Sequence, residues 1–179
     1  TAAGLERAAA LPLAGVAKRA GAALLSPFAR GMGFRYERLR RSAAGMPVFW
    51  SGAEAFTEVT KRDLLSPRLR ADFAKRSSWE VIEPFWDRFR RSRLDQHPLN
   101  WMAYIDLNVR LPELLLMRVD KMSMGVGLEA RVPFLDHEFV QTAMGVDQRL
   151  RIHDGELKYI LKRAVKGLLP AELLKRPKQ

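Results

Sequence analysis

Apolar residues recur along most of the chain with the periodicity of an α-helix, whereas strict alternation of apolar and polar residues is almost absent. Two apolar rows show the helical pattern clearly, one formed by Trp79, Ile82, Trp86 and Phe89 and the other by Trp101, Ile105 and Val109. We therefore predict a mostly α-helical fold with few β-strands or none.

Capping residues and prolines indicate where the predicted helices begin and end. Ser51 is placed to cap one helix, and Glu54 would complete its capping box. Pro112 is expected to separate two helices, because proline removes a backbone N–H and crowds the preceding turn. In chain order, helices are predicted over about residues 5–25 with a kink at Pro12, 34–41, 51–61, 67–75, from a cap at Ser77 or Ser78 to the break at His97–Pro98, 100–110 and 114–119.

A short extended segment is predicted before the last two helices. Val132 precedes Pro133, which displaces it from helical towards extended backbone. Asp136 is then predicted to cap a new helix, with Glu138 in its first turn. The segment would therefore be a crossing between two helices.

The final helix has the clearest apolar face, formed by Leu157, Ile160, Leu161, Ala164, Val165 and Leu168. Asp154 is its predicted N-cap, and Lys158 lies in its first turn, off the apolar face. A lysine in the first turn opposes the helix dipole, so it does not favour the helix itself. Its ammonium would suit an anion such as phosphate. From the residues alone, an ordinary surface lysine is the simpler alternative.

Two further charged residues, Glu129 and Arg131, are candidates for chemistry. On extended backbone they would face the same side. Glu129 would then contact the amine or carboxylate region of a substrate, and Arg131 an anionic group. Equally, they would form a buried ion pair that fixes the crossing between helices. Met122, Met124 and Met144 are predicted to fill gaps in the core.

Composition narrows the classes of protein. With 179 residues, the chain is long enough for one ordinary domain with a sizeable core. It has no cysteine, which excludes a disulfide framework, a cysteine nucleophile and thiolate metal sites, and fits a reducing compartment. Its 3 histidines are far apart, so no metal site is expected. No apolar run is long enough to span a bilayer, so no membrane partner is expected.

The net charge of +11 would attract nucleic acid, anionic lipid or phosphate-bearing ligands. The row of Trp79, Trp86 and Phe89, flanked by arginines, would even suit stacked bases. We favour a helix whose apolar row faces the core and whose opposite, basic face is solvated, because the arginines fall mostly off the apolar face. Nucleic acid is thus an unlikely partner, although a non-catalytic basic helical module for nucleic acid or an anionic surface stays as the alternative function.

Four blocks of sequence point to a known family: Arg118–Met124 (RVDKMSM), Glu129–Asp136 (EARVPFLD), Gly155–Tyr159 (GELKY), and Leu168–Pro170 with Lys175–Gln179 (LLP and KRPKQ). In this order they resemble the synthetase domain of the glutamine-dependent asparagine synthetases and their amidotransferase relatives. The segment 49–67 bears a weaker likeness to the preceding part of that domain. The resemblance implies that residues 1–179 are one helical fragment, the C-terminal portion of an α/β adenine nucleotide alpha hydrolase-like (PP-loop) domain.

The resemblance also implies an activity for the parent enzyme. It would adenylate a carboxylate, by default aspartate, with ATP and Mg²⁺, and ammonia from glutamine would then form the amide. We expect a cytoplasmic enzyme, and a homodimer is compatible with the resemblance. The Ser-Gly-Gly-x-Asp-Ser pyrophosphate loop and the glutaminase cysteine of the family do not occur here. The fragment is therefore not expected to turn over alone, and a family member that has lost catalysis is a further alternative.

Residue by residue, the resemblance makes Lys158 the catalytic candidate, since the matching lysine of the family lies beside the ATP phosphates and assists the departure of pyrophosphate. It places Asp120, Glu129 and Arg131 at the pocket for ATP and substrate, without a chemical step for any of them. Metal ligands are expected outside this fragment. Asp136 is better explained as a helix cap than as a catalyst.

Overall fold

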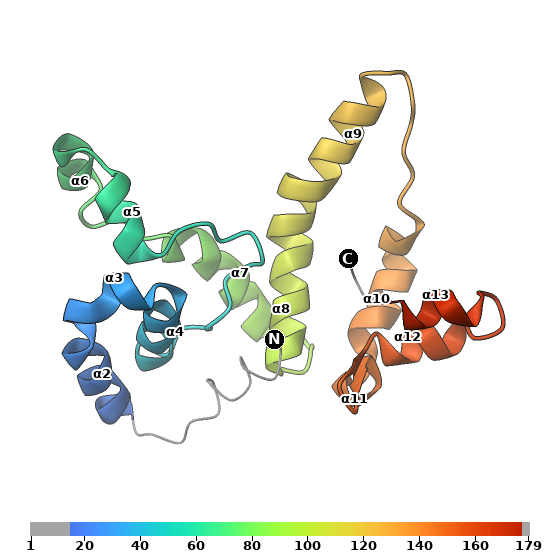
Figure 1. Cartoon of the computed structure of the whole chain (residues 1–179), viewed down its shortest axis with the longest axis horizontal. Helices are drawn as coiled ribbons and strands as arrows, with labels where there is room; N and C mark the ends of the chain where they lie inside the picture. Colours follow the sequence, from blue (N-terminus) through green and yellow to red (C-terminus); the bar gives the residue numbers. More distant parts are fainter. Residues whose placement is uncertain (1–14, 177–179) are drawn as a thin grey trace. The chain divides into compact units, whose positions relative to one another are not determined.

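The computed structural model describes residues 15–176 of the chain, which are mostly helical as predicted (Figure 1). The chain divides into two compact units, residues 1–130 and 131–179. The assignment of one domain to the whole chain stays a prediction. The predicted first helix is confirmed over Gly15–Leu24, and its earlier part, with Pro12, lies outside the described residues.

The first unit is built entirely of helices in its described part. They are α2 (Gly15–Leu24), η1 (Ser26–Phe28), α3 (Ala29–Met32), α4 (Phe34–Ala43), α5 (Glu58–Leu64), α6 (Pro67–Asp72), α7 (Trp79–Arg91), α8 (Pro98–Ile105), η2 (Asp106–Leu116) and α9 (Met117–Met124). Within residues 15–176, no helix combines the length and apolar character that a membrane span requires. The helix predicted to start near Pro67 is confirmed, because the Ser66 hydroxyl accepts the N–H of Leu69.

Aromatic side chains from α7 and α8 form the core of the first unit. Phe89 and Trp101 are buried, with ring centroids 5.5 Å apart. Trp86 meets Trp101 edge-on at 4.9 Å, an arrangement that aromatic quadrupoles favour. Ile82 and Ile105 complete the cluster. Both predicted apolar rows therefore face the core, which supports the core interpretation over a base-stacking surface.

The predicted helix from Ser51 to about residue 61 is wrong in its first half. Helix α5 begins at Glu58 and is capped by Thr57, whose hydroxyl accepts the N–H of Thr60. The Ser51 hydroxyl donates instead to the carboxylate of Asp106 on η2, at 3.0 Å. Because Ser51 is bound to this distant partner, its hydroxyl does not start a helix.

A buried ionic cluster holds the loop that replaces this predicted half-helix. The Arg41 side chain, 2% exposed, donates to Glu37 at 3.2 Å and to the carbonyl of Val48 at 3.1 Å. It also forms a two-pronged pair with Glu54, one prong at 2.9 Å. Its guanidinium lies 3.7 Å from the ring centre of Trp50, in cation–π geometry. Glu54 is therefore part of this ionic cluster and not of a capping box.

The predicted break at Pro112 does not occur. Helix α8, the π-helix η2 and α9 run on without interruption, as the long yellow-green helix in Figure 1 shows. In an α-helix the proline ring would clash with the carbonyl of the preceding turn. The wider turn of a π-helix relieves that clash, so Pro112 is accommodated inside the helix.

Glu58 in the first turn of α5 is a carboxylate whose ionised form the fold favours. Burial, the largest single influence, raises its pKa. Hydrogen bonds from the Lys61 ammonium at 2.8 Å and the Ser78 N–H at 3.0 Å outweigh burial and hold the pKa of Glu58 below its usual value.

The lowered pKa of Glu58 predicts a pH dependence of stability. Its contribution is fully present above the pKa of the unfolded chain, about 4.3, and is lost as pH falls through the lower folded value. We expect Glu58→Gln to reduce the loss of unfolding free energy between about pH 5 and pH 3. Urea denaturation across this range measures it, and identical pH profiles for the two chains would contradict the expectation.

The second unit contains short helices around one small hairpin. Its elements are η3 (Pro133–Leu135), α10 (His137–Gly145), α11 (Gln148–Arg151), β1 (Ile152–His153), β2 (Glu156–Leu157), α12 (Tyr159–Ala164) and α13 (Ala171–Lys175). The strands pair antiparallel, Ile152 opposite Leu157. Asp154 and Gly155 form the turn, both with positive φ, as hairpin turns of the I′ type require. The predicted N-cap at Asp154 is therefore wrong.

Apolar side chains remain exposed at the end of the first unit and throughout the second. Met122 and Met124 are 76% and 55% exposed, so they do not fill core gaps as predicted. On the predicted apolar face of the last helix, Leu157 and Leu168 are 60% and 78% exposed. None of the side chains described in residues 131–176 is fully buried. The predicted helix is shorter than expected, because Leu157 lies on β2 and Leu168 lies beyond the end of α12, and these apolar side chains are uncovered.

Candidate functional site

Lys158 lies at the corner between strand β2 and helix α12. It occupies the N-cap position, one residue before the first helical turn in which it was predicted. Its backbone is left-handed, with φ 58° and ψ 32°, a region that non-glycine residues rarely adopt. The side chain is exposed, and within residues 15–176 no hydrogen bond or ion pair engages its ammonium. Lys158 is thus a cation available to a ligand.

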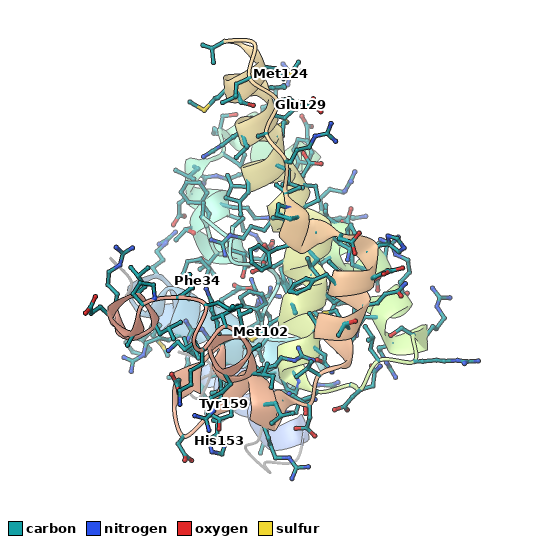
Figure 2. All side chains as sticks on the ribbon, turned by 90° about the vertical axis from the view of Figure 1, so that its right-hand side faces the viewer. Phe34, Met102, Met124, Glu129, His153 and Tyr159 are labelled. Atoms are coloured by element: carbon teal, nitrogen blue, oxygen red, sulfur yellow. The ribbon has the colours of Figure 1, made fainter. Side chains whose placement is uncertain are left out.

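Two contacts flank Lys158 and bind the hairpin to the helix. The rings of His153 on β1 and Tyr159 on α12 lie 4.6 Å apart, and Figure 2 labels both. The Glu156 carboxylate accepts from the Lys162 ammonium at 2.8 Å. Strained backbone persists where its surroundings determine it, and these contacts lie on either side of the strained residue. Helix α12 has six residues, so the charge of Lys158 matters more here than the helix dipole.

The residues flanking Lys158 were missed in the sequence, although one signal for them was present. Asp154–Gly155 is a dipeptide typical of hairpin turns, and it was assigned to a helix cap instead. A hairpin at this point brings His153 opposite Glu156, which places both beside the corner.

Glu129 and Arg131 lie in the extended segment that the sequence predicts, between α9 and η3. Both side chains are exposed, so the alternative of a buried ion pair is wrong. Glu129, labelled in Figure 2, belongs to the first unit, and Arg131 opens the second. Their role at a substrate pocket stays a prediction.

Asp120 lies on α9 with an exposed side chain. Its backbone carbonyl accepts the hydroxyl of Ser123 at 3.2 Å. Within residues 15–176 its carboxylate has neither a hydrogen bond nor an ion pair, so it is an acceptor open to a ligand. Asp120 and Glu129 belong to the first unit, and Arg131 and Lys158 to the second. That these four residues form one site therefore remains a prediction.

Asp136 caps a helix, as predicted. Its carboxylate accepts the N–H groups of Glu138 at 3.0 Å and Phe139 at 3.1 Å, the first free donors of α10. Two hydrogen bonds to backbone leave its carboxylate engaged in helix initiation, which agrees with the structural role.

Asp136→Ala is expected to destabilise α10 by about 1 kcal/mol, because two backbone N–H groups lose their acceptor. Asp136→Asn keeps a side-chain oxygen and is expected to retain most of the protection. Amide hydrogen exchange over residues 137–145 measures both. Equal exchange in the alanine and asparagine variants would argue against the cap.

The described residues can be tested for the groups that the reaction would use. Among residues 15–176, no cluster of three or more histidine and carboxylate side chains could hold a metal ion. A free ammonium such as that of Lys158 does fit a polyphosphate, which it would engage as a point charge.

Comparisons with known proteins agree with one another. A family model described as "Asparagine synthase" matches residues 19–179. Glutamine-hydrolysing asparagine synthetase 1 of Bacillus subtilis (strain 168) is 36% identical over 80 residues, which are 45% of this chain and 13% of the relative. A putative glutamine-hydrolysing asparagine synthetase of Mycobacterium bovis is 32% identical over 130 residues, 73% of this chain and 19% of the relative.

A third relative, the glutamine-hydrolysing asparagine synthetase of Gallus gallus, is 43% identical over 75 residues, 38% of this chain and 13% of the relative. No solved structure shows a significant match to this chain. The chain therefore spans only about a tenth to a fifth of the length of these curated relatives.

Proposed function

Because this chain belongs to the asparagine synthase family, we propose that it forms the C-terminal helical portion of an enzyme that converts a carboxylate into an amide. The enzyme uses ATP to activate the carboxylate as an acyl-adenylate, with release of pyrophosphate. Ammonia derived from glutamine then attacks the acyl carbon. Aspartate is the default substrate, and the cytoplasm is the proposed location.

Lys158 is the residue that we assign to the chemistry. Adenylation leaves negative charge on the departing pyrophosphate, and a fixed cation beside it lowers the barrier electrostatically. The observation that carries this assignment is an exposed ammonium that has no ion partner within residues 15–176, on a left-handed residue between two contacts. Such an ammonium can bind pyrophosphate without first breaking an ion pair. Bound Mg²⁺ would supply further charge neutralisation, from ligands outside the described residues.

Asp120, Glu129 and Arg131 are proposed to line the pocket. The planar guanidinium of Arg131 suits a carboxylate or phosphate, and the carboxylates of Asp120 and Glu129 suit an amine or a ribose hydroxyl. All three side chains are exposed and therefore accessible to a ligand.

The uncovered apolar residues support the proposal that this chain is part of a larger domain. Leu157 on β2, Leu161 on α12 and Leu168 after it are apolar side chains that stay exposed among the described residues of the second unit. Exposed apolar faces of this kind mark surfaces that pack against protein. We propose that the remainder of a synthetase domain covers this face.

Exchange of labelled pyrophosphate into ATP by the full-length protein that carries this chain tests the function. Aspartate and a panel of other carboxylates are added one at a time, with glutamine omitted so that only adenylation is measured. Exchange that one carboxylate switches on would support the proposal and identify the substrate. No exchange with any carboxylate, together with nucleic-acid binding of steep salt dependence, would favour the basic module instead.

A further inference from the structure

A pocket of about 280 Å³ lies in the first unit, and none of the candidate synthetase residues lines it. It opens between the loop 45–49, helix α7 and the start of helix α8. Its volume is at the lower end of the range for small-molecule sites, so it would admit a single ring with a short side chain.

Aromatic rings form the walls of this pocket and are held in place. Phe49, Trp86 and Trp101 line it, together with Met46 and with Met102, which is labelled in Figure 2. The Trp101 indole donates to the carbonyl of Phe49 at 2.6 Å, which ties the loop to α8. Because Trp101 is 3% exposed and packs edge-on against Trp86, these walls exist before any ligand arrives.

The polar side of the pocket is positively charged. Of the described residues that line it, only Lys18 on α2 is charged. Within residues 15–176 no ion pair or hydrogen bond engages the Lys18 ammonium. The Gln96 amide N–H₂ donates to the carbonyls of Phe89 and Leu94, so the amide oxygen is the end left for a ligand or water.

We propose that this pocket binds a small aromatic carboxylate. The ring lies against Trp86, Trp101 and Phe49, where apolar burial and ring-to-ring contacts hold it. The carboxylate meets the ammonium of Lys18 in a charge-assisted hydrogen bond. A neutral aromatic compound would fill the same walls and leave Lys18 without its anion, so the site discriminates by charge. The site is separate from the amide-forming chemistry and does not depend on it.

Titration of 3-phenylpropionate into the full chain tests the proposal, with 3-phenylpropionamide as the neutral ligand of the same shape. Calorimetry measures affinity, and the indole N–H signals of the 4 tryptophans report the place of binding by NMR. We expect the signals of Trp86 and Trp101 to shift with the acid. Trp50 and Trp79 do not line the pocket and serve as internal references.

Lys18→Met is expected to weaken binding of the acid about tenfold to a hundredfold and to leave the amide unaffected. Lys75→Met removes an exposed lysine outside the pocket and is expected to change neither. Met102→Trp narrows the pocket and is expected to weaken both ligands. No binding of the acid, equal affinity for acid and amide, or an acid affinity that Lys18→Met leaves intact in a folded chain would each overturn the proposal.

Discussion

Lys158→Ala is expected to lower carboxylate-dependent ATP–pyrophosphate exchange by about two to three orders of magnitude. The substitution removes the ammonium of a side chain that no carboxylate neutralises within residues 15–176. Its effect should fall on the rate of exchange more than on the KM for ATP, because the negative charge develops on pyrophosphate as it leaves. Steady-state exchange kinetics of the full-length protein separate these two quantities.

Two further variants distinguish an effect of Lys158 on exchange from an effect on folding. Lys158→Gly removes the same ammonium and relieves the left-handed backbone, so it should lose exchange equally while stabilising the fold by about 0.5 kcal/mol. Lys166→Ala removes an exposed lysine elsewhere in the second unit and is expected to keep exchange. If Lys158→Ala retains exchange in a folded protein, the role of this lysine is wrong and the family assignment is unaffected.

Arg41→Met is expected to destabilise the first unit by about 3–5 kcal/mol. The loss of Arg41 would leave the carboxylate of Glu37, which is 0% exposed, with only the partly exposed Arg40 as its guanidinium partner. It would also release the loop at Val48 and Glu54 and remove the cation from the face of Trp50. Urea denaturation followed by tryptophan fluorescence measures the change in unfolding free energy.

An exposed ion pair elsewhere in the same unit provides the matched control. Arg30 donates two hydrogen bonds to Asp63, with side chains 77% and 41% exposed. Arg30→Met removes the same group from a two-pronged ion pair but leaves its partner in water, so we expect only a small change in stability. The double variant Arg41→Met with Glu37→Gln should recover part of the loss. Equal changes in unfolding free energy for Arg30→Met and Arg41→Met would show that burial of the ion pair does not determine its contribution to stability.

Local signals in the sequence were sufficient for several elements. Asp136 caps its helix as predicted, and the helix predicted from residue 67 begins after a cap at Ser66, because the partners of both caps are backbone N–H groups within three residues. The apolar rows of α7 and α8 also face the core as predicted, since side-chain periodicity on a helix directly selects the buried face.

Features that depend on distant partners escaped prediction. Ser51 fits a cap in sequence, but it lies against Asp106, 55 positions away. Glu54 likewise pairs with Arg41, which the pattern of either segment alone does not reveal. Tertiary contacts of this kind override local preference. Prediction of the candidate site is limited for a similar reason. Its four residues are divided between two units, and the sequence shows only their type and order.

The number of residues in the π-helical stretch Asp106–Leu116 determines which way the side chains of α9 point around the helix axis. Each residue of a helix turns the chain by about 100° around the axis. Loss of one residue in this stretch would therefore rotate all of α9, and with it Asp120, by roughly a quarter turn, without any change in the amino acids of α9. Natural insertions or deletions here would re-aim the helix end in a single genetic event, whereas substitutions would leave its aim unchanged.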